Sequence, residues 1–252
     1  MTTHASSNGT LSRRAFVQAV GGTTALTAMT GGSLGAALFA GPTPSSAAET
    51  AVTEFYKTMS DKQRGQIVFP FNHELRSRIN ANWNITKPEI GQDFYTDKQR
   101  TLIDQVVRGM TSKDGYERLI HQMNDDAGGI EQFSVAVFGK PGEGDFEFEL
   151  TGRHLTLRAD GNSVDKAAFG GPIVYGHGVD EAAENMYYSQ TKQANEVFKS
   201  LDADQARKAL VTKAPPKENA VQVQGDKGRF AGIGVGELKD DQKQLVEKTL
   251  SV

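Results

Sequence analysis

The sequence predicts an α+β fold, a single domain in which an antiparallel sheet is flanked by helices. Three observations support this class. Polar stretches with apolar residues at helical spacing lie toward both ends of the chain, as in Leu102, Ile103, Val106 and Val107. Between them, residues 133–158 show the alternation that is typical of strands. Glycine-rich turns separate the alternating stretches, so we expect consecutive strands to pair as hairpins.

A leader precedes the predicted domain. Residues 1–48 contain no Asp or Glu and only two basic residues, Arg13 and Arg14. The paired arginines, with Phe16 two positions further on, resemble the twin-arginine signal that is read by the twin-arginine translocon. We therefore expect the chain to be exported, to a periplasmic or extracellular location, with this translocon as its partner.

Small residues at the end of the leader predict cleavage after Ala48. Residues 1–48 are then a twin-arginine signal peptide, and residues 49–252 form a single globular α+β domain. An uncleaved anchor is the alternative, because residues 21–40 are weakly apolar and about 20 such residues can cross a bilayer. The sequence has no later membrane-spanning candidate, so we expect no stable membrane insertion after cleavage.

Charge and cysteine content exclude several functions. Without the leader, 26 basic residues face 31 acidic ones, a formal net charge of −5. Nucleic acid is therefore not an expected partner, because phosphate binding needs a basic face. The chain contains no cysteine, which excludes disulfides, thiolate nucleophiles and iron–sulfur clusters.

Several predicted helices begin with the same pattern, a capping residue three positions before a glutamine. This is the spacing of a capping box, in which both side chains satisfy amides at the helix N-terminus. We interpret the pattern as recurrent capping chemistry rather than an internal repeat. The pairs are Ser60 with Gln63, Thr96 with Gln99 and Asp202 with Gln205, and a looser relative precedes Gln242.

The predicted strands form a short meander. Residues 133–138 and 145–150 alternate on either side of a glycine-rich turn, which indicates a hairpin. A third strand is expected from His154 to Arg158. Further on, acidic residues at the start of the segment 179–201 indicate a helix, and alternating apolar and glycine residues at 228–236 indicate an edge strand.

Five stretches of the chain resemble a bacterial family catalogued as domain of unknown function 3500. The family typically has two adjacent histidines where this chain has Arg153 before His154, so a metal site that used both imidazoles would be weakened here. The resemblance implies a common fold and carries no known activity. The matching stretches are Met110 to Tyr116, Val137 to Pro141, Phe148 to Leu157, Phe169 to Pro172, and Phe230 to Ile233.

The predicted domain has four histidines, and no two of them lie four residues apart on a helix. Three arrangements around His154 remain open. In the first, neutral imidazoles and a carboxylate bind a divalent transition metal as cofactor; the ligands would be His73, His154 and His177 with Glu149 or Glu74.

In the second arrangement, Arg153 and Arg76 bind an anionic small molecule and His154 acts as a catalytic acid or base. Trp83 and His177, which lies between two glycines, are further ligand-binding candidates. In the third, His154 and Arg153 have only structural partners on a neighbouring strand.

Together these observations predict an exported protein of unknown activity, with Arg153 and His154 as the catalytic candidates. It would be a metal-dependent or hydrolytic enzyme that acts on a small molecule. The alternative is a non-catalytic binding protein of the cell envelope for a small anionic ligand. The sequence does not decide whether the chain is an enzyme.

Overall fold

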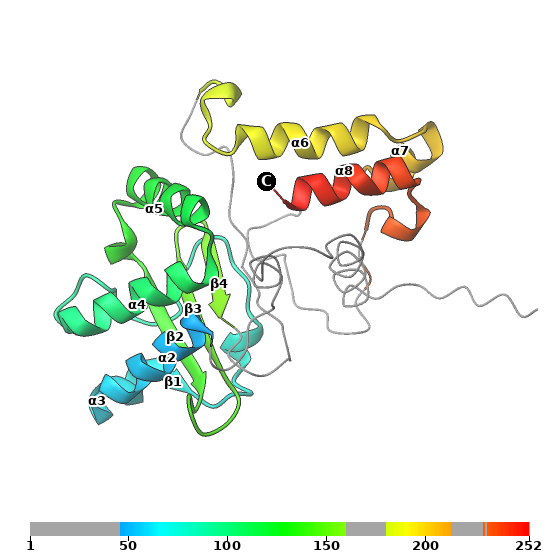
Figure 1. Ribbon diagram of the computed structural model, residues 1–252. Helices are drawn as coiled ribbons and strands as arrows, with labels where there is room; N and C mark the ends of the chain where they lie inside the picture. The colour runs from blue at the N-terminus through cyan, green and yellow to red at the C-terminus, as the bar shows by residue number, and fades with distance from the viewer. Residues whose placement is uncertain (1–45, 160–179, 213–228, 230, 252) are drawn as a thin grey trace, which may run out of the picture. The chain divides into compact units, whose positions relative to one another are not determined.

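The computed structural model describes residues 46–159, 180–212, 229 and 231–251 (Figure 1). These residues fall into two compact units, each described here by itself. The sheet unit contains residues 46–159, 180–187 and 229, and the helical unit contains residues 188–212 and 231–251. Within the described residues, no helix is both long enough and apolar enough to span a membrane.

The sheet unit contains four α-helices, four strands and short 3₁₀ turns. The helices are α2 (Ala47–Thr58), α3 (Asp61–Ile67), α4 (Asp97–Met110) and α5 (Lys113–Ala127). The strands are β1 (Val68–Phe69), β2 (Ser134–Gly139), β3 (Phe146–Gly152) and β4 (Leu155–Ala159). The 3₁₀ turns are η3 (Glu74–Ser77), η4 (Ile130–Gln132) and η5 (Ala182–Glu184).

The helical unit consists of α6 (Tyr188–Lys199), α7 (Ala203–Ala209), the 3₁₀ turn η7 (Val235–Glu237) and α8 (Asp240–Leu250). Two expectations for this region were wrong. The helix expected from residue 179 begins only at Tyr188, because η5 and a turn come first. In place of the strand expected at 228–236, the described residues form bends and η7.

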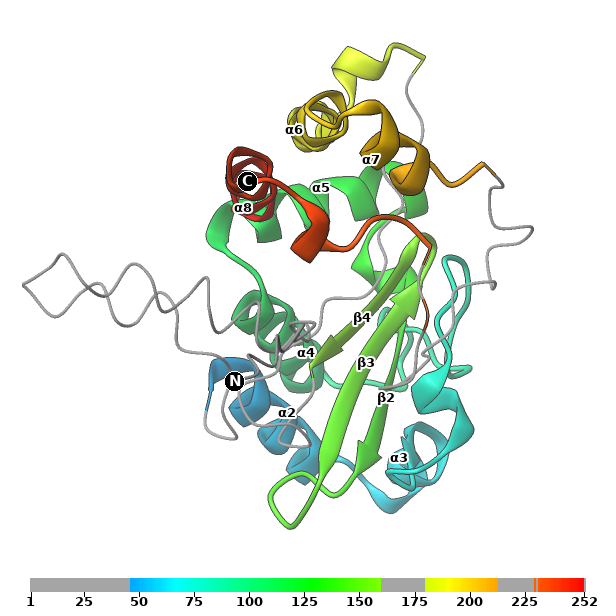
Figure 2. The same cartoon turned by 90° about the vertical axis from the view of Figure 1, so that its right-hand side faces the viewer.

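The sheet has the order β1-β2-β3-β4. Strands β2, β3 and β4 form the expected antiparallel meander (Figure 2). At the edge, β1 pairs with β2 in parallel, through Val68 with Val137 and Phe69 with Phe138. The α+β class is therefore confirmed, and the sheet is mixed rather than purely antiparallel.

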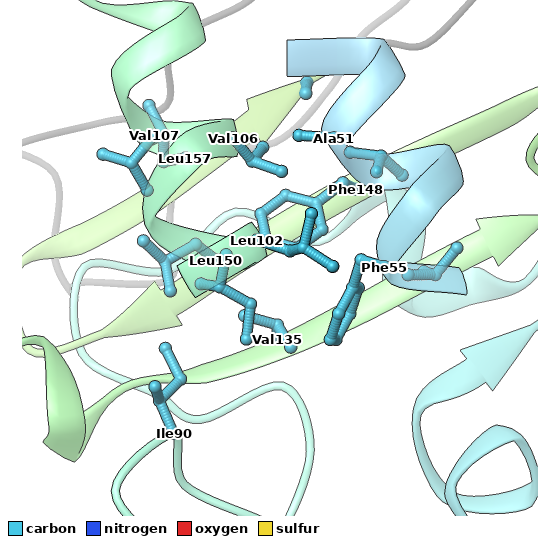
Figure 3. Packing of buried hydrophobic residues seen from close by; sticks show 14 of the residues in the cluster. Ala51, Phe55, Ile90, Leu102, Val106, Val107, Val135, Phe148, Leu150 and Leu157 are labelled. Carbon is cyan, nitrogen blue, oxygen red and sulfur yellow. The ribbon is translucent and has the colours of Figure 1, made fainter. Parts of the chain in front are cut away.

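One face of the sheet packs under α2 and α4. Because side chains alternate along a strand, Val135, Phe148, Leu150 and Leu157 share this face, as Figure 3 shows. They meet Phe55 and other apolar residues of the two helices, and the cluster is fully buried. Burial of this apolar surface is the main source of stability in the unit.

The opposite face of the sheet, the polar face, is mostly polar, with an apolar patch around Ala136 and Phe138 of β2, and is also buried. It carries Thr151 on β3 and Thr156 on β4, and the segment 78–90 covers it through hydrogen bonds. The Thr156 hydroxyl donates to the carbonyl oxygen of Asn80 at 2.6 Å, and the amide of Ile85 donates to Thr151 Oγ1 at 2.8 Å. Both faces of the sheet are thus enclosed, one by helices and one by a hydrogen-bonded segment.

Helix α2 includes the position at which leader cleavage is predicted. Ala48 lies in its first turn with 2% of its surface exposed. A side chain at Gly109 of α4 would collide with the backbone of Ala48, so the two helices touch closely here. Cleavage after Ala48 would therefore divide α2.

Candidate functional site

The turn between β3 and β4 presents the two residues that the sequence analysis selected as catalytic. Gly152 pairs with Leu155, which leaves Arg153 and His154 as a two-residue turn. The expectation that His154 begins a strand was therefore wrong. Its φ angle of 60° lies in the left-handed region, which few residues other than glycine adopt, although histidine is enriched among those that do.

Asp126 brings Arg153 and His154 together. It lies in the last turn of α5, and its side chain is 5% exposed. Arg153 Nε donates to Asp126 Oδ1 at 3.0 Å, and His154 Nδ1 contacts Asp126 Oδ2. A carboxylate at a helix C-terminus is disfavoured by the helix dipole, so the neighbouring guanidinium and imidazole offset an unfavourable position.

The geometry assigns different roles to the two nitrogens of His154. When Nδ1–H donates to a carboxylate, the ring is fixed in one tautomer and Nε2 is the nitrogen that can accept a proton. The His154 side chain is 16% exposed and that of Arg153 is 39% exposed. The carboxylate is thus enclosed, while the imidazole and the guanidinium reach the surface.

A second histidine–aspartate pair lies on the same helix. His121 Nε2 contacts Asp125 Oδ2 at 2.9 Å, and both side chains are more than 60% exposed. A pair at this exposure is screened by water and contributes little to stability. It therefore serves as an internal comparison for the enclosed pair of Asp126 and His154.

A buried ion cluster lies on the polar face of the sheet. Register places Glu149 opposite Arg158, and the guanidinium of Arg158 contacts both Glu149 and Glu147. Arg158 Nη2 also donates to the carbonyl oxygen of Arg78 at 2.7 Å, while Arg76 Nη1 donates to Glu147 Oε2 at 3.1 Å. The carboxylates are at most 4% exposed.

Burial raises the pKa of Glu149 to about 9, and the Arg158 guanidinium offsets this only in part. The folded state therefore holds a proton on Glu149 that the unfolded state releases above its ordinary pKa of 4.5. The contribution of this proton to the free energy of unfolding is fully present below pH 4.5, and it is lost as the pH rises toward about 9.

We expect Glu149→Gln to remove this pH dependence, because a neutral amide does not titrate. Chemical denaturation from pH 5 to pH 8 should show the variant gaining about 1 kcal/mol or more on the wild type as pH rises. Equal slopes for the two proteins across this interval would contradict the assigned protonation of Glu149.

The other predicted site residues do not join Asp126 and His154. Trp83 lies beside the turn, since its backbone amide donates to the Gly152 carbonyl oxygen at 3.4 Å. Its indole Nε1 donates instead to Thr156 Oγ1 at 3.0 Å, beneath the guanidinium of Arg78. Arg76 belongs to the buried ion cluster, where Glu149 also lies, so neither meets His154. His177 lies outside the described residues.

His73 and His154 lie toward opposite ends of the sheet. The His73 ring packs beside Phe138, which pairs with Glu147, whereas His154 follows Gly152 at the far end of β3. The five residue steps along the strand from Glu147 to Gly152 correspond to about 17 Å. The described residues contain no group of three or more side chains suited to holding a metal ion.

Sequence reasoning assigned no side-chain partner to Asp126 or to Arg158. Asp126 stands in a run that ends a helix, where a solvated carboxylate is the usual expectation. Arg158 could have been found from the strand pattern, since Glu147, Glu149 and Arg158 all occupy alternating positions of paired strands. The partner of Asp126 depends on a long-range contact, for which the local sequence holds no signal.

The fold and the site define an α+β protein in which a mixed sheet, covered by helices on its apolar face, ends in a turn with a carboxylate–imidazole–guanidinium cluster. The chain belongs to the family described as "Protein of unknown function (DUF3500)", whose model matches residues 42–252. Neither the search of curated proteins nor the search of solved structures gave a match.

Proposed function

We propose that the protein is an exported enzyme that hydrolyses a small anionic molecule. His154 would be the general base, oriented by Asp126, and Arg153 would contact the anionic group of the substrate. The observation that carries the proposal is the enclosed contact of His154 with Asp126. Export rests on the leader with Arg13 and Arg14, and cell fractionation after Arg→Lys substitution of both checks it.

The chemistry follows from the three side chains. His154 Nε2 would remove a proton from a water molecule as that water attacks the substrate, and the Asp126 carboxylate would stabilise the resulting imidazolium. Arg153 would hold a carboxylate or phosphate group beside the imidazole. The proton then passes from Nε2 to the leaving group, which returns the imidazole to its starting state.

The conformation of His154 supports a functional role. A left-handed residue other than glycine costs about 1 kcal/mol, and such strain gathers at functional sites. Glycine or asparagine would fit this turn at lower cost. A histidine at this position is therefore best explained by a functional role of its imidazole.

The test is hydrolysis of two probes, p-nitrophenyl phosphate and a p-nitrophenyl ester of a dicarboxylic acid. We expect His154→Asn, which keeps the left-handed turn, and Asp126→Asn to lower kcat by about 100-fold or more. The matched control is His121→Asn, which removes the exposed imidazole and should leave kcat unchanged. Equal losses in the variants of His121 and His154 would contradict the proposal.

A non-catalytic anion-binding protein is the second candidate, favoured by the 39% exposure of the Arg153 side chain. It predicts no hydrolysis of either probe. It also predicts a rise in melting temperature with phosphate or succinate that disappears in Arg153→Met. This outcome would replace the enzyme proposal with the binding proposal.

A further inference from the structure

Two parts of the chain contain the same unusual hydrogen-bonded arrangement. In the sheet unit, Gln63 and Gln99 are the third residues of α3 and α4, and each completes a capping box. Their side-chain amides also bond each other, with Gln63 Nε2 donating to Gln99 Oε1 at 2.9 Å and Gln99 Nε2 donating to Gln63 Oε1 at 3.2 Å.

The helical unit repeats this arrangement with Gln205 of α7 and Gln242 of α8. Gln205 Nε2 donates to Gln242 Oε1 at 3.0 Å, and Gln242 Nε2 donates to Gln205 Oε1 at 2.8 Å. Both glutamines also accept a hydrogen bond from the backbone amide at the N-cap of their own helix. The exposed fraction is 1% for Gln242 and also for Gln99, its counterpart.

The backbone partners of the amides correspond as well. In each unit, each glutamine donates to the carbonyl oxygen two residues before the N-cap of the other helix. These carbonyls belong to Phe94 and Thr58 in the sheet unit, and to Glu237 and Ser200 in the helical unit. Helical ion pairs match too, Glu54–Lys57 with Glu196–Lys199 and Asp97–Arg100 with Asp240–Lys243.

This agreement exceeds what recurrent capping predicts. We define the first module as α2, α3, β1 and α4, and the second module as α6, α7, Leu210–Val211 and α8. The two residues of β1, Val68 and Phe69, lie five and six positions after Gln63. Leu210 and Val211 lie at the same distances after Gln205. The interpretation of these motifs as capping alone was therefore too narrow.

The first module shows what such a module contacts. Its β1 pairs in parallel with β2, and its helices α2 and α4 cover the apolar side of the sheet that includes β2. Val107 of α4 is fully buried there. Leu250 stands at the equivalent place of α8 and is 70% exposed.

Among the described residues, the second module has no partner strand or apolar sheet face of this kind. Leu210 and Val211 are 58% and 55% exposed, and neither is in a described strand pair. All large hydrophobic residues that are exposed in the described part of the chain belong to the helical unit. Exposed apolar surface of this kind marks an interaction site.

We infer that the second module is a docking surface for an extended apolar segment of another polypeptide. The segment would pair in parallel with Leu210–Val211, as β2 pairs with β1, and its apolar side chains would pack on α6 and α8 near Leu250. Backbone hydrogen bonds would supply affinity, and alternating apolar residues would supply selectivity. This inference does not depend on the proposed hydrolytic site.

The probe is a labelled peptide with the sequence of residues 132–140, which contains β2, the strand that pairs with the first module. Fluorescence anisotropy against the full chain should show saturable binding. We expect at least tenfold weaker binding with Val211→Pro, which removes a backbone donor, and with Leu250→Asp. The control Ala203→Asp adds the same charge at an exposed position of α7 and should bind as the wild type does.

Circular dichroism shows whether each variant keeps its helices, which is expected because the substituted side chains are exposed. Hydrogen exchange supplies a second measurement at Val211, because the Leu210 amide already donates to the Ala206 carbonyl oxygen within the chain. The Val211 amide should exchange fast alone and slowly with the peptide. The inference is overturned if the peptide does not bind, if Val211→Pro and Leu250→Asp bind like Ala203→Asp, or if the Val211 amide is already protected without peptide.

Discussion

Replacing Arg158 by methionine is expected to lower the free energy of unfolding by about 3 to 5 kcal/mol at neutral pH. Methionine approximates the volume of the arginine stem but leaves the buried carboxylate of Glu147 with Arg76 as its remaining cationic partner, and it removes the guanidinium that contacts the protonated Glu149. It also removes the donor to the carbonyl oxygen of Arg78, which helps to hold the segment that covers the polar face. Urea denaturation measures the loss.

The loss should shrink at acidic pH, because protonation of Glu147 removes the negative charge that Arg158 helps to neutralise. Arg207→Met is the control, since Arg207 pairs with Asp204 while both side chains are more than 70% exposed. It should change stability by less than about 0.5 kcal/mol. If Arg158→Met were as mild, the ion cluster would not be important for holding the sheet and its cover together.

A comparable loss, about 3 kcal/mol, is expected for Gly139→Ala at the end of β2. Gly139 has a φ angle of 78°, and a Cβ atom there would overlap the backbone carbonyl of Asp145 across the hairpin. Backbone cannot move aside as a flexible side chain can, so the hairpin itself must distort. Thermal denaturation followed by circular dichroism measures the effect.

Gly144→Ala is the matched control in the same hairpin. A Cβ atom at Gly144 would meet nothing within 4 Å, and this glycine does not have a positive φ angle. We expect a change below about 0.5 kcal/mol. Equal melting temperatures for the two variants would show that the hairpin tolerates the clash, contrary to the expectation.

Local chemistry explains which elements could be predicted from the sequence. The capping boxes at Ser60, Thr96 and Asp202 are confirmed, because capping involves residues three positions apart. The hairpin of β2 and β3 is confirmed as well, since alternation and a glycine-rich turn occur within one short stretch. In contrast, β1 is only two residues long and shows no alternation from which it could be recognised.

The candidate site could be predicted only in part. Arg153 and His154 were identified, but their common partner Asp126 comes from another element, and its approach depends on how α5 packs. The strand boundary was misplaced by one residue, because nothing local distinguishes a histidine that ends a turn from one that begins a strand. That single residue decides whether the two side chains diverge or share a carboxylate.

The parallel pairing of β1 with β2 has a consequence for the order of assembly. Val68 and Val137 are far apart along the chain, whereas the pairs within the meander of β2, β3 and β4 join near neighbours. Closing the longer loop costs more chain entropy, and the pairing gained in return involves a strand of only two residues. We therefore expect the meander to form early in folding and β1, with helix α2, to be added late.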